Sequence, residues 1–288
     1  MSEVIKVSPS LVKSLIVPRP PGSKKGDNGT VLVVGGNKIY HGAPILASLA
    51  AMRSGTDLVY TAVPRSNTLP TRAMSPNAIV LPMSDDKLTL GSANRLTAML
   101  PKIPNSAAIG MGMTIAKPEA LKSLIKRLRE KGTRLLLDAS ALIPAVLDDI
   151  AGTGTIITPH PGEYKRIFGE EAGKDEREQV VNVQKMTSRY KIVMVLKGPV
   201  NIICDSKRIA LIKRSTPAMT VGGTGDVLSG LSAGFLSKMD HFDACLLGVY
   251  FNGAAASLAH GRLGLHMVAT DIIDELPNVL KDYDIINS

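Results

Sequence analysis

Cysteine and aromatic residues are scarce in this 288-residue sequence, and their scarcity excludes several classes of protein. The two cysteines, Cys204 and Cys245, lie far apart without the spacing of metal ligands. We therefore expect two buried free thiols in a reducing compartment and no disulfide framework. Aromatic residues make up 3% of the chain and tryptophan is absent, which leaves little to stack on nucleic-acid bases. We expect no nucleic-acid partner.

Long apolar runs are also missing. No run approaches the length of a membrane span, and the first ten residues have no basic segment leading into an apolar stretch. We therefore expect a soluble, cytoplasmic protein with no membrane partner. The net charge of +9 is scattered along the chain. It fits an enzyme whose ligands are phosphorylated nucleotides, although a solvated positive surface explains it equally well.

Short β-branched runs alternate with longer segments of helical periodicity from about residue 30 onward. This pattern indicates βαβ units and an α/β fold with a mostly parallel central sheet. The predicted strands are 31–34, 58–63, 79–83, 107–109, 135–137, 156–158 and 192–196, and 201–204 with 208–213 predict an antiparallel hairpin. The predicted helices are 43–53, 93–99, 117–131, 175–189, 225–237, 242–260 and 269–280. No linker or repeat divides the chain, so we expect a single domain over 1–288.

The segment Gly222-Gly223-Thr224-Gly225-Asp226 opens the apolar helical run 227–236 and is the most informative part of the sequence. Its glycines allow backbone N–H groups to face a ligand, and a helix start attracts anions. Asp226 would repel such an anion unless it takes up a proton, so it is a candidate general base for a hydroxyl that attacks a phosphoryl group. The alternative is a glycine turn in which Asp226 only caps the helix.

Three further motifs follow predicted strands, at the sheet edge where open α/β folds bind ligands. Gly35-Gly36 precedes the helix that includes Ala43 and Pro44, and Gly110-Met111-Gly112 ends another strand. Both are also explained by packing and simple turns. Lys197-Gly198-Pro199-Val200-Asn201 ends a third strand, where Lys197 would meet a phosphate as a point charge. The alternative is a charged turn.

His160-Pro161-Gly162-Glu163 joins a strand to a helix and places an imidazole and a carboxylate one helical turn apart. Two prolines and a glycine fix the direction of this segment, which favours a ligand contact for His160 over a capping role. Asp138 also follows a strand. It would either orient a metal-bound water or cap the next helix.

Together these motifs resemble the ADP- or ATP-dependent NAD(P)H-hydrate dehydratases, in that family's order and spacing across roughly residues 20–280. The resemblance implies a ribokinase-like fold, a three-layer α/β/α sandwich. It also implies a repair reaction on NAD(P)H hydrated at C6 of the nicotinamide ring. The C6 hydroxyl of the S epimer is phosphorylated by ADP or ATP, and phosphate is then eliminated to restore NAD(P)H.

The resemblance also implies roles for individual residues. Asp226 would be the base, and Ala43, Gly112 and His160 would line the hydrated-dinucleotide site with it. Glu163 would help to place Mg²⁺ through water. The adenine nucleotide would be held by Lys197, Gly198, Pro199, Val200, Asn201, Thr216, Gly222, Gly223, Thr224 and Gly225. Family members form tetramers and act with an NAD(P)H-hydrate epimerase, so we expect a homotetramer and that functional partner.

The sequence departs from the family pattern near the nicotinamide, at Met111 and Thr114, and before the anion turn, at Thr216 and Ala218. These changes leave Asp226 and its glycines intact. One alternative is a vitamin-precursor kinase of the same fold, which would stop at the phosphate ester. A second is a nucleotide-binding sensor without catalysis, against which the intact Asp226 argues.

Overall fold

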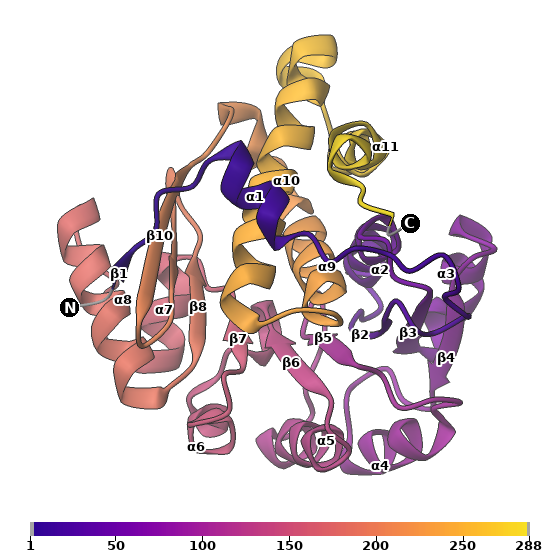
Figure 1. Ribbon diagram of the computed structural model, residues 1–288. Coiled ribbons are helices and arrows are strands. Elements are labelled where there is room, and N and C mark those ends of the chain that lie inside the picture. Colours follow the sequence, from indigo (N-terminus) through magenta and orange to yellow (C-terminus); the bar gives the residue numbers. More distant parts are fainter. Residues whose placement is uncertain (1–2, 287–288) are drawn as a thin grey trace.

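Ten strands form one continuous sheet in the computed structural model, which describes residues 3–286 (Figure 1). Their order across the sheet is β1-β10-β9-β8-β7-β6-β5-β2-β3-β4. The strands are β1 Glu3–Val4, β2 Thr30–Val34, β3 Leu58–Pro64, β4 Ile79–Met83, β5 Ser106–Ile109, β6 Arg134–Leu137, β7 Ile156–Ile157, β8 Val193–Leu196, β9 Val200–Cys204 and β10 Arg208–Lys213.

Strand direction confirms the predicted mostly parallel sheet. Strands β2 to β8 are parallel to one another, and β9 is antiparallel to both β8 and β10. The predicted hairpin is therefore present, with Lys213 opposite Val200 and Ile212 opposite Asn201. This register brings the end of β10 beside the start of β9, so the residues that follow β8 and those that follow β10 share one edge.

Eleven α-helices in residues 3–286 cover the sheet on both faces. They are α1 Pro9–Leu15, α2 Gly42–Arg53, α3 Thr68–Met74, α4 Leu90–Met99, α5 Pro118–Glu130, α6 Leu147–Ile150, α7 Pro161–Phe168, α8 Glu176–Tyr190, α9 Thr224–Leu236, α10 His241–Leu263 and α11 Ala269–Leu280. Short 3₁₀ turns span Arg65–Asn67, Ala139–Ala141, Pro144–Val146, Pro217–Thr220, Gly264–His266 and Lys281–Tyr283. The sequence pattern did not indicate β1, α1, α3 or α6.

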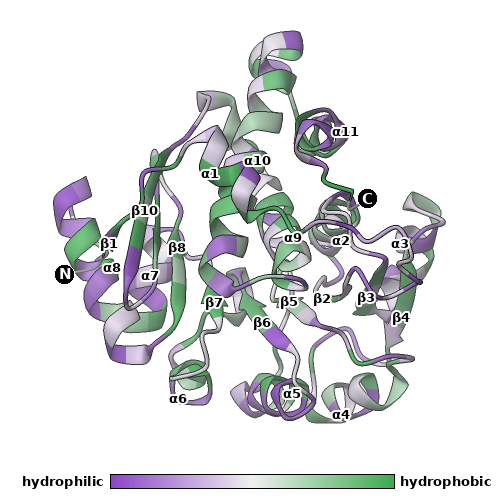
Figure 2. Cartoon of the chain, in the orientation of Figure 1, coloured by the Kyte–Doolittle hydropathy of each residue, from purple (hydrophilic) through white to green (hydrophobic). Residues whose placement is uncertain are grey.

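Alternate residues of the central strands enter two separate cores. In β2, Val31 and Val33 pack with α2, α9, α10 and α11, whereas Leu32 and Val34 pack with α4, α5, α7 and α8. All four side chains are fully buried, and burial of each stabilises the fold by about 1.5–3 kcal/mol. Figure 2 shows the apolar residues on the central strands and polar ones on outer helices such as α5 and α11. The result is the expected three-layer α/β/α sandwich.

Small residues bring α2 and α9 unusually close together. A Cβ at Gly230 of α9 would lie 1.9 Å from the carbonyl oxygen of Ala47 in α2, and one at Gly234 would lie 2.0 Å from Ser54 Oγ. No side chain fits at either position, so the backbones of the two helices touch. The starts of α2 and α9 consequently lie side by side at the carboxyl edge of the sheet (Figure 1).

The sheet has its topological switch between β2 and β5. From β2 the chain proceeds to β3 and β4 on one side, and it then returns to β5 on the other side of β2. A crevice forms outside the carboxyl ends of the strands at such a point, and ligands bind there in open α/β sheets. The predicted glycine motifs after β2 and β5 both lie at this point.

Helix α10 corrects one expectation from the sequence. Within residues 3–286, the stretch His241–His266 has the length and composition of a membrane span, with a mean hydropathy of 1.3 over its most apolar window. That window is 67% buried inside the protein, as expected of a core helix. Its alanines and glycines pack against α9, α11 and the sheet. The prediction of buried free thiols is confirmed, since Cys204 and Cys245 are unpaired and fully buried.

Candidate active site

The turn before α9 presents backbone donors at the carboxyl edge of the sheet. Gly223 caps the helix in the left-handed region (φ 96°), and a Cβ there would lie 2.6 Å from Leu46 Cδ1. Thr224 Oγ1 donates a hydrogen bond to the carbonyl oxygen of Met219 (2.9 Å) and holds the turn in place. The first intrahelical hydrogen bond is from Val227 N to Gly223 O. The N–H groups of 224–226 precede it and are therefore available to an anion.

Asp226 places a carboxylate in the first turn of α9, beside these donors. The side chain is half-buried, and no hydrogen bond from residues 3–286 reaches its carboxylate. Burial raises the pKa of Asp226 to about 7, aided by the negative charges of Asp138 and Glu163 and opposed by Lys197. A carboxylate with a pKa near neutrality is suited to accept a proton from a hydroxyl and to release it again.

Lys197 lies beneath the turn, between two other carboxylates. Its Nζ is 2.9 Å from Asp138 Oδ1 and 3.7 Å from Glu163 Oε2, and a Cβ on Gly225 would lie 3.5 Å from the same nitrogen. Burial alone would lower the pKa of Lys197, but the nearby carboxylates hold it above its ordinary value. The ammonium therefore remains charged and shields Asp226 from its acidic neighbours.

Asp138 anchors this cluster from the end of β6. Burial alone would raise the pKa of its carboxyl group, but Lys197 and hydrogen bonds hold it below the ordinary value. Ser229 Oγ of α9 donates to Oδ2 at 2.7 Å, and Ala139 N donates to Oδ1 at 2.8 Å. Of the two roles predicted for Asp138, the structure shows the cap, and it adds an ion pair that the sequence did not indicate.

His160 caps α7, which is the role the sequence disfavoured. Its Nδ1 accepts hydrogen bonds from Gly162 N (3.0 Å) and Glu163 N (3.3 Å), while Glu163 Oε2 accepts one from His160 N (2.9 Å). This reciprocal capping box fixes the direction of the ring. The His160 side chain is still 57% exposed, and the ring also lines a cavity. The other ring nitrogen, Nε2, lies 3.6 Å from Glu163 Oε1.

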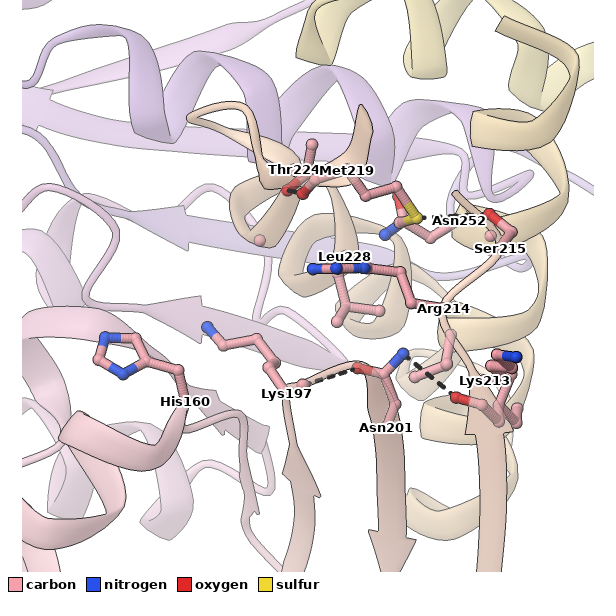
Figure 3. A pocket seen from close by; sticks show the side chains of 15 residues that line it. His160, Lys197, Asn201, Lys213, Arg214, Ser215, Met219, Thr224, Leu228 and Asn252 are labelled. Carbon is pink, nitrogen blue, oxygen red and sulfur yellow. Dashed lines mark hydrogen bonds between the residues drawn. The ribbon is translucent and has the colours of Figure 1, made fainter. Parts of the chain in front are cut away.

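That cavity lies between the ends of β8 and β10, the anion turn and α10 (Figure 3). Its volume is about 240 Å³, close to the lower end of the range for small-molecule sites. The lining residues are His160, Lys197, Gly198, Asn201, Ile212, Lys213, Arg214, Ser215, Met219, Thr224, Gly225, Leu228, Val249, Asn252 and Gly253. Five residues predicted to hold the nucleotide are among them, Lys197, Gly198, Asn201, Thr224 and Gly225.

The other five predicted nucleotide residues lie outside the cavity wall and shape it. Pro199 O accepts a hydrogen bond from Arg214 N (2.8 Å), and Val200 pairs with Lys213 in the hairpin. Thr216 is 3% exposed, and its side chain caps the 3₁₀ turn Pro217–Thr220. Gly223 supplies the left-handed cap and Gly222 precedes it. These residues hold the lining residues in position.

Sequence reasoning missed the far wall of the cavity, which consists of Ile212 to Ser215, Met219, Leu228 and three residues of α10. Asn252 of α10 is 4% exposed, and its Oδ1 has no hydrogen-bond partner among residues 3–286. The available signal was the hairpin, because its register places Ile212 opposite Asn201 and Arg214 beside Pro199. The apolar faces of α9 and α10 carried no signal that distinguishes a cavity wall from core.

Ala43 and Gly112 lie at the switch point, apart from the cavity wall. Gly112 has φ 61°, and a Cβ there would lie 2.7 Å from Tyr40 Cβ and 3.1 Å from Ala43 Cβ. The loops after β2 and β5 are joined by a hydrogen bond from Gly36 N to Met111 O (2.8 Å). Because α2 packs on α9, this second region and the anion turn face each other across the starts of the two helices.

Glu163 was predicted to help to place Mg²⁺ through water, and its partners in the structure bear on that role. Residues 3–286 contain no cluster of three or more His, Cys, Asp or Glu side chains that would hold a metal by themselves. Both oxygens of Glu163 already have close partners, His160 N and Lys197 at Oε2 and His160 Nε2 at Oε1 (3.6 Å). The donor chemistry fits a Mg²⁺ held chiefly by phosphate oxygens and water, with Glu163 behind a water molecule.

Comparison with known proteins places this site in context. The profile of a family described as NAD(P)H-hydrate dehydratase matches residues 31–278. The chain is 48% identical over 276 residues to the ADP-dependent (S)-NAD(P)H-hydrate dehydratase of Nitrosopumilus maritimus, and the match covers 96% of each chain. It is 37% identical to a bifunctional NAD(P)H-hydrate repair enzyme of Pyrobaculum aerophilum, of which it covers 53%.

A solved structure also matches. The ADP/ATP-dependent NAD(P)H-hydrate dehydratase of Bacillus subtilis, co-crystallised with ATP and Mg²⁺, superimposes with a TM-score of 0.82 at 26% identity. The match covers 96% of this chain and 97% of that one.

Proposed function

Because the chain belongs to the NAD(P)H-hydrate dehydratase family, we propose that it converts the S epimer of hydrated NAD(P)H back to NAD(P)H with ADP as the phosphoryl donor. The observation that carries this function in the structure is the position of Asp226, whose carboxylate shares one helix turn with the anion donors of 224–226. A base and a phosphate site are thus adjacent, as phosphoryl transfer to a hydroxyl requires.

In the first step, the C6 hydroxyl oxygen of the substrate attacks the terminal phosphorus of ADP. The bond from that phosphorus to the bridging oxygen breaks, AMP leaves with the electron pair, and Asp226 accepts the hydroxyl proton. The backbone N–H groups of Thr224 and Gly225 face the charge that develops on the phosphoryl oxygens. A pKa of about 7 allows Asp226 to be ionised at the start of the cycle.

In the second step, the C6–O bond breaks and its electron pair leaves with phosphate. A proton leaves C5, and the C5–C6 double bond of the dihydronicotinamide forms again. Hydroxide is a poor leaving group from an sp³ carbon, and phosphate is a good one. The net reaction converts hydrated NAD(P)H and ADP into NAD(P)H, AMP, phosphate and a proton, so no redox step is needed.

The residues divide between two ligands. The cavity beside Lys197, Gly198, Asn201, Thr224 and Gly225 is proposed to hold the adenine nucleotide, and the switch-point region near Ala43 and Gly112 the hydrated dinucleotide. The reacting atoms meet at Asp226, between the starts of α2 and α9. His160 borders the cavity and presents its ring from α7. Mg²⁺ would neutralise phosphate charge, with Glu163 as its contact through water.

We further propose a cytoplasmic homotetramer that acts with an epimerase of hydrated NAD(P)H. The bifunctional name and double length of the Pyrobaculum aerophilum relative support the functional partner. Ile39 and Tyr40 are 76% and 62% exposed beside Gly112, and an interface between subunits would cover this apolar surface. Light scattering coupled to size exclusion would measure the assembly.

The test of the reaction is absorbance at 340 nm after purified protein is mixed with hydrated NADH, Mg²⁺ and either ADP or ATP. A nucleotide-dependent rise with release of inorganic phosphate is the expected result. The vitamin-kinase alternative, which the family assignment does not favour, would leave the phosphate esterified. A folded protein that gives neither a rise nor phosphate would contradict the proposal.

A further inference from the structure

The charged side chains that line the cavity are all positive. Among its lining residues, Lys197, Lys213 and Arg214 carry full positive charges, and none of the lining residues has a carboxylate. Such a cavity suits a ligand with several negative charges. The partners of each cation in the structure determine whether it is free to contact that ligand.

Lys197 is already committed to fixed carboxylates. Its ammonium pairs with Asp138 and Glu163, and the side chain is only 19% exposed. A nucleotide phosphate that recruits this ammonium would leave Asp138 buried without its partner, which is costly. Lys213 is exposed at the end of β10, so water already solvates its ammonium group.

Arg214 differs from both. Its backbone N–H donates to Pro199 O (2.8 Å), so its position is fixed against the turn after β8. Its side chain is half-buried, yet it makes no ion pair or hydrogen bond with any residue of 3–286. Figure 3 shows the guanidinium extending from the end of β10 into the cavity, on the side where Lys197 and Thr224 lie. A partly desolvated guanidinium without an acceptor is matched to an incoming anion.

We propose that Arg214 binds the phosphate chain of the adenine nucleotide and thereby selects ADP over the product AMP. This inference rests on the proposed function, because the cavity must be the nucleotide site. A guanidinium presents two parallel N–H groups to phosphate oxygens, which an ammonium does not. After phosphoryl transfer, AMP has lost the phosphate that Arg214 holds, so the product leaves more easily than the substrate.

The experiment is calorimetric titration of adenosine, AMP and ADP, with Mg²⁺ present, into wild type, R214Q and R214K. We expect R214Q to weaken ADP binding by about 10- to 100-fold, AMP binding by less, and adenosine binding hardly at all. R214K keeps the charge and should lie between wild type and R214Q for ADP. K207Q, an equal charge change on the exposed turn at the opposite end of the hairpin, should leave all three affinities unchanged.

The outcomes are distinct. Equal losses for all three ligands in R214Q would place Arg214 on the base or in the fold, and no loss for ADP would also overturn the inference. If circular dichroism shows that R214Q does not fold, the same comparison of the three ligands in R214K tests the inference. A wild-type protein that binds no ADP and restores no absorbance at 340 nm would overturn the proposed function itself, whatever the Arg214 variants do.

Discussion

Lys197 Nζ lies 2.9 Å from Asp138 Oδ1, and this buried ion pair joins the ends of β8 and β6 directly below Asp226. Asp138 is 2% exposed, and Ser229 from the helix of Asp226 holds its second oxygen. The pair therefore connects the sheet to α9 and also sets the charge that Asp226 experiences. Removal of the Asp138 charge tests the two effects by separate measurements, stability for the link to α9 and pH dependence for the charge near Asp226.

Asp138→Asn should shift the pH dependence of activity toward acid. The substitution removes a negative charge near Asp226 and leaves Lys197 less compensated, so the pKa of Asp226 should fall. We expect the acidic limb of kcat/KM to move down by about 1 pH unit, with a loss of about 2–3 kcal/mol of stability because a buried pair is broken. Asp148→Asn, an exposed change of equal charge, is the control, and an unmoved limb in Asp138→Asn would contradict the argument.

The wild-type protein should lose activity below neutral pH. Burial raises the pKa of Asp226 to about 7, and only the ionised carboxylate can accept the hydroxyl proton. Below that pKa, kcat/KM should fall about tenfold for each pH unit. The measurement is the initial rate at 340 nm from pH 5.5 to 9 at constant ionic strength. A profile that is flat down to pH 5.5 would exclude Asp226 as the base.

Asp226→Ala should lower turnover by about two to four orders of magnitude while nucleotide binding is largely kept. The carboxylate accepts no hydrogen bond within residues 3–286, so its loss removes no structural contact of that kind. Single-turnover rates together with ADP titration separate chemistry from binding. Near-normal turnover would assign the proton transfer to another group.

Asp226→Asn should in addition stabilise the protein above neutral pH. The folded state holds the proton of Asp226 more tightly than the unfolded chain, whose pKa is the ordinary 3.8. Stability therefore falls as pH rises from about 4 to about 7, and the ionised group costs the folded protein about 1–4 kcal/mol above that range. Urea unfolding at pH 8 should show the gain in the variant, and unfolding at pH 4 should show little difference. Equal stability at both values would mean that burial does not perturb the group.

Gly230→Ala should destabilise the protein and lower activity with it. A Cβ would lie 1.9 Å from Ala47 O, so α2 and α9 must separate. Overpacking of this kind costs about 1–3 kcal/mol or more. Gly261→Ala in α10, where a Cβ meets nothing within 4 Å, should be neutral or stabilising. Thermal unfolding of both variants makes the comparison, and an equal effect of the two would disprove the role assigned to close packing.

Periodicity predicted most of the fold, because each long strand or helix repeats its own pattern many times. The hairpin of β9 and β10 was predicted from two apolar runs and a short polar turn. Helices α1 and α3, of seven residues each, and α6, of four, were missed because they are too short for a periodic signal, and α1 and α3 also contain proline. The sequence analysis did not recognise that the stretch containing α10 has the length and composition of a membrane span, because alanine and glycine lower its hydropathy.

The sequence predicted the turns and helix starts that form the site, but it did not predict which side chains pair there. Glycine turns and helix starts are local, so the anion turn and Asp226 could be identified from a few adjacent residues. Lys197 and Asp138 are 59 residues apart, and nothing local indicates that they pair. Arg214 is equally invisible, because what distinguishes it is the lack of an acceptor among residues 3–286, a property of packing.

The cap that His160 provides for α7 also decides its tautomer. Two backbone N–H groups point at Nδ1, so that nitrogen must offer its lone pair, and a neutral ring then carries its hydrogen on Nε2. That Nε2 lies 3.6 Å from Glu163 Oε1, so the neutral ring presents its N–H to a carboxylate of the same capping box. A helix terminus, built from local sequence alone, thereby fixes both the tautomer and the orientation of the ring that His160 presents to the cavity wall.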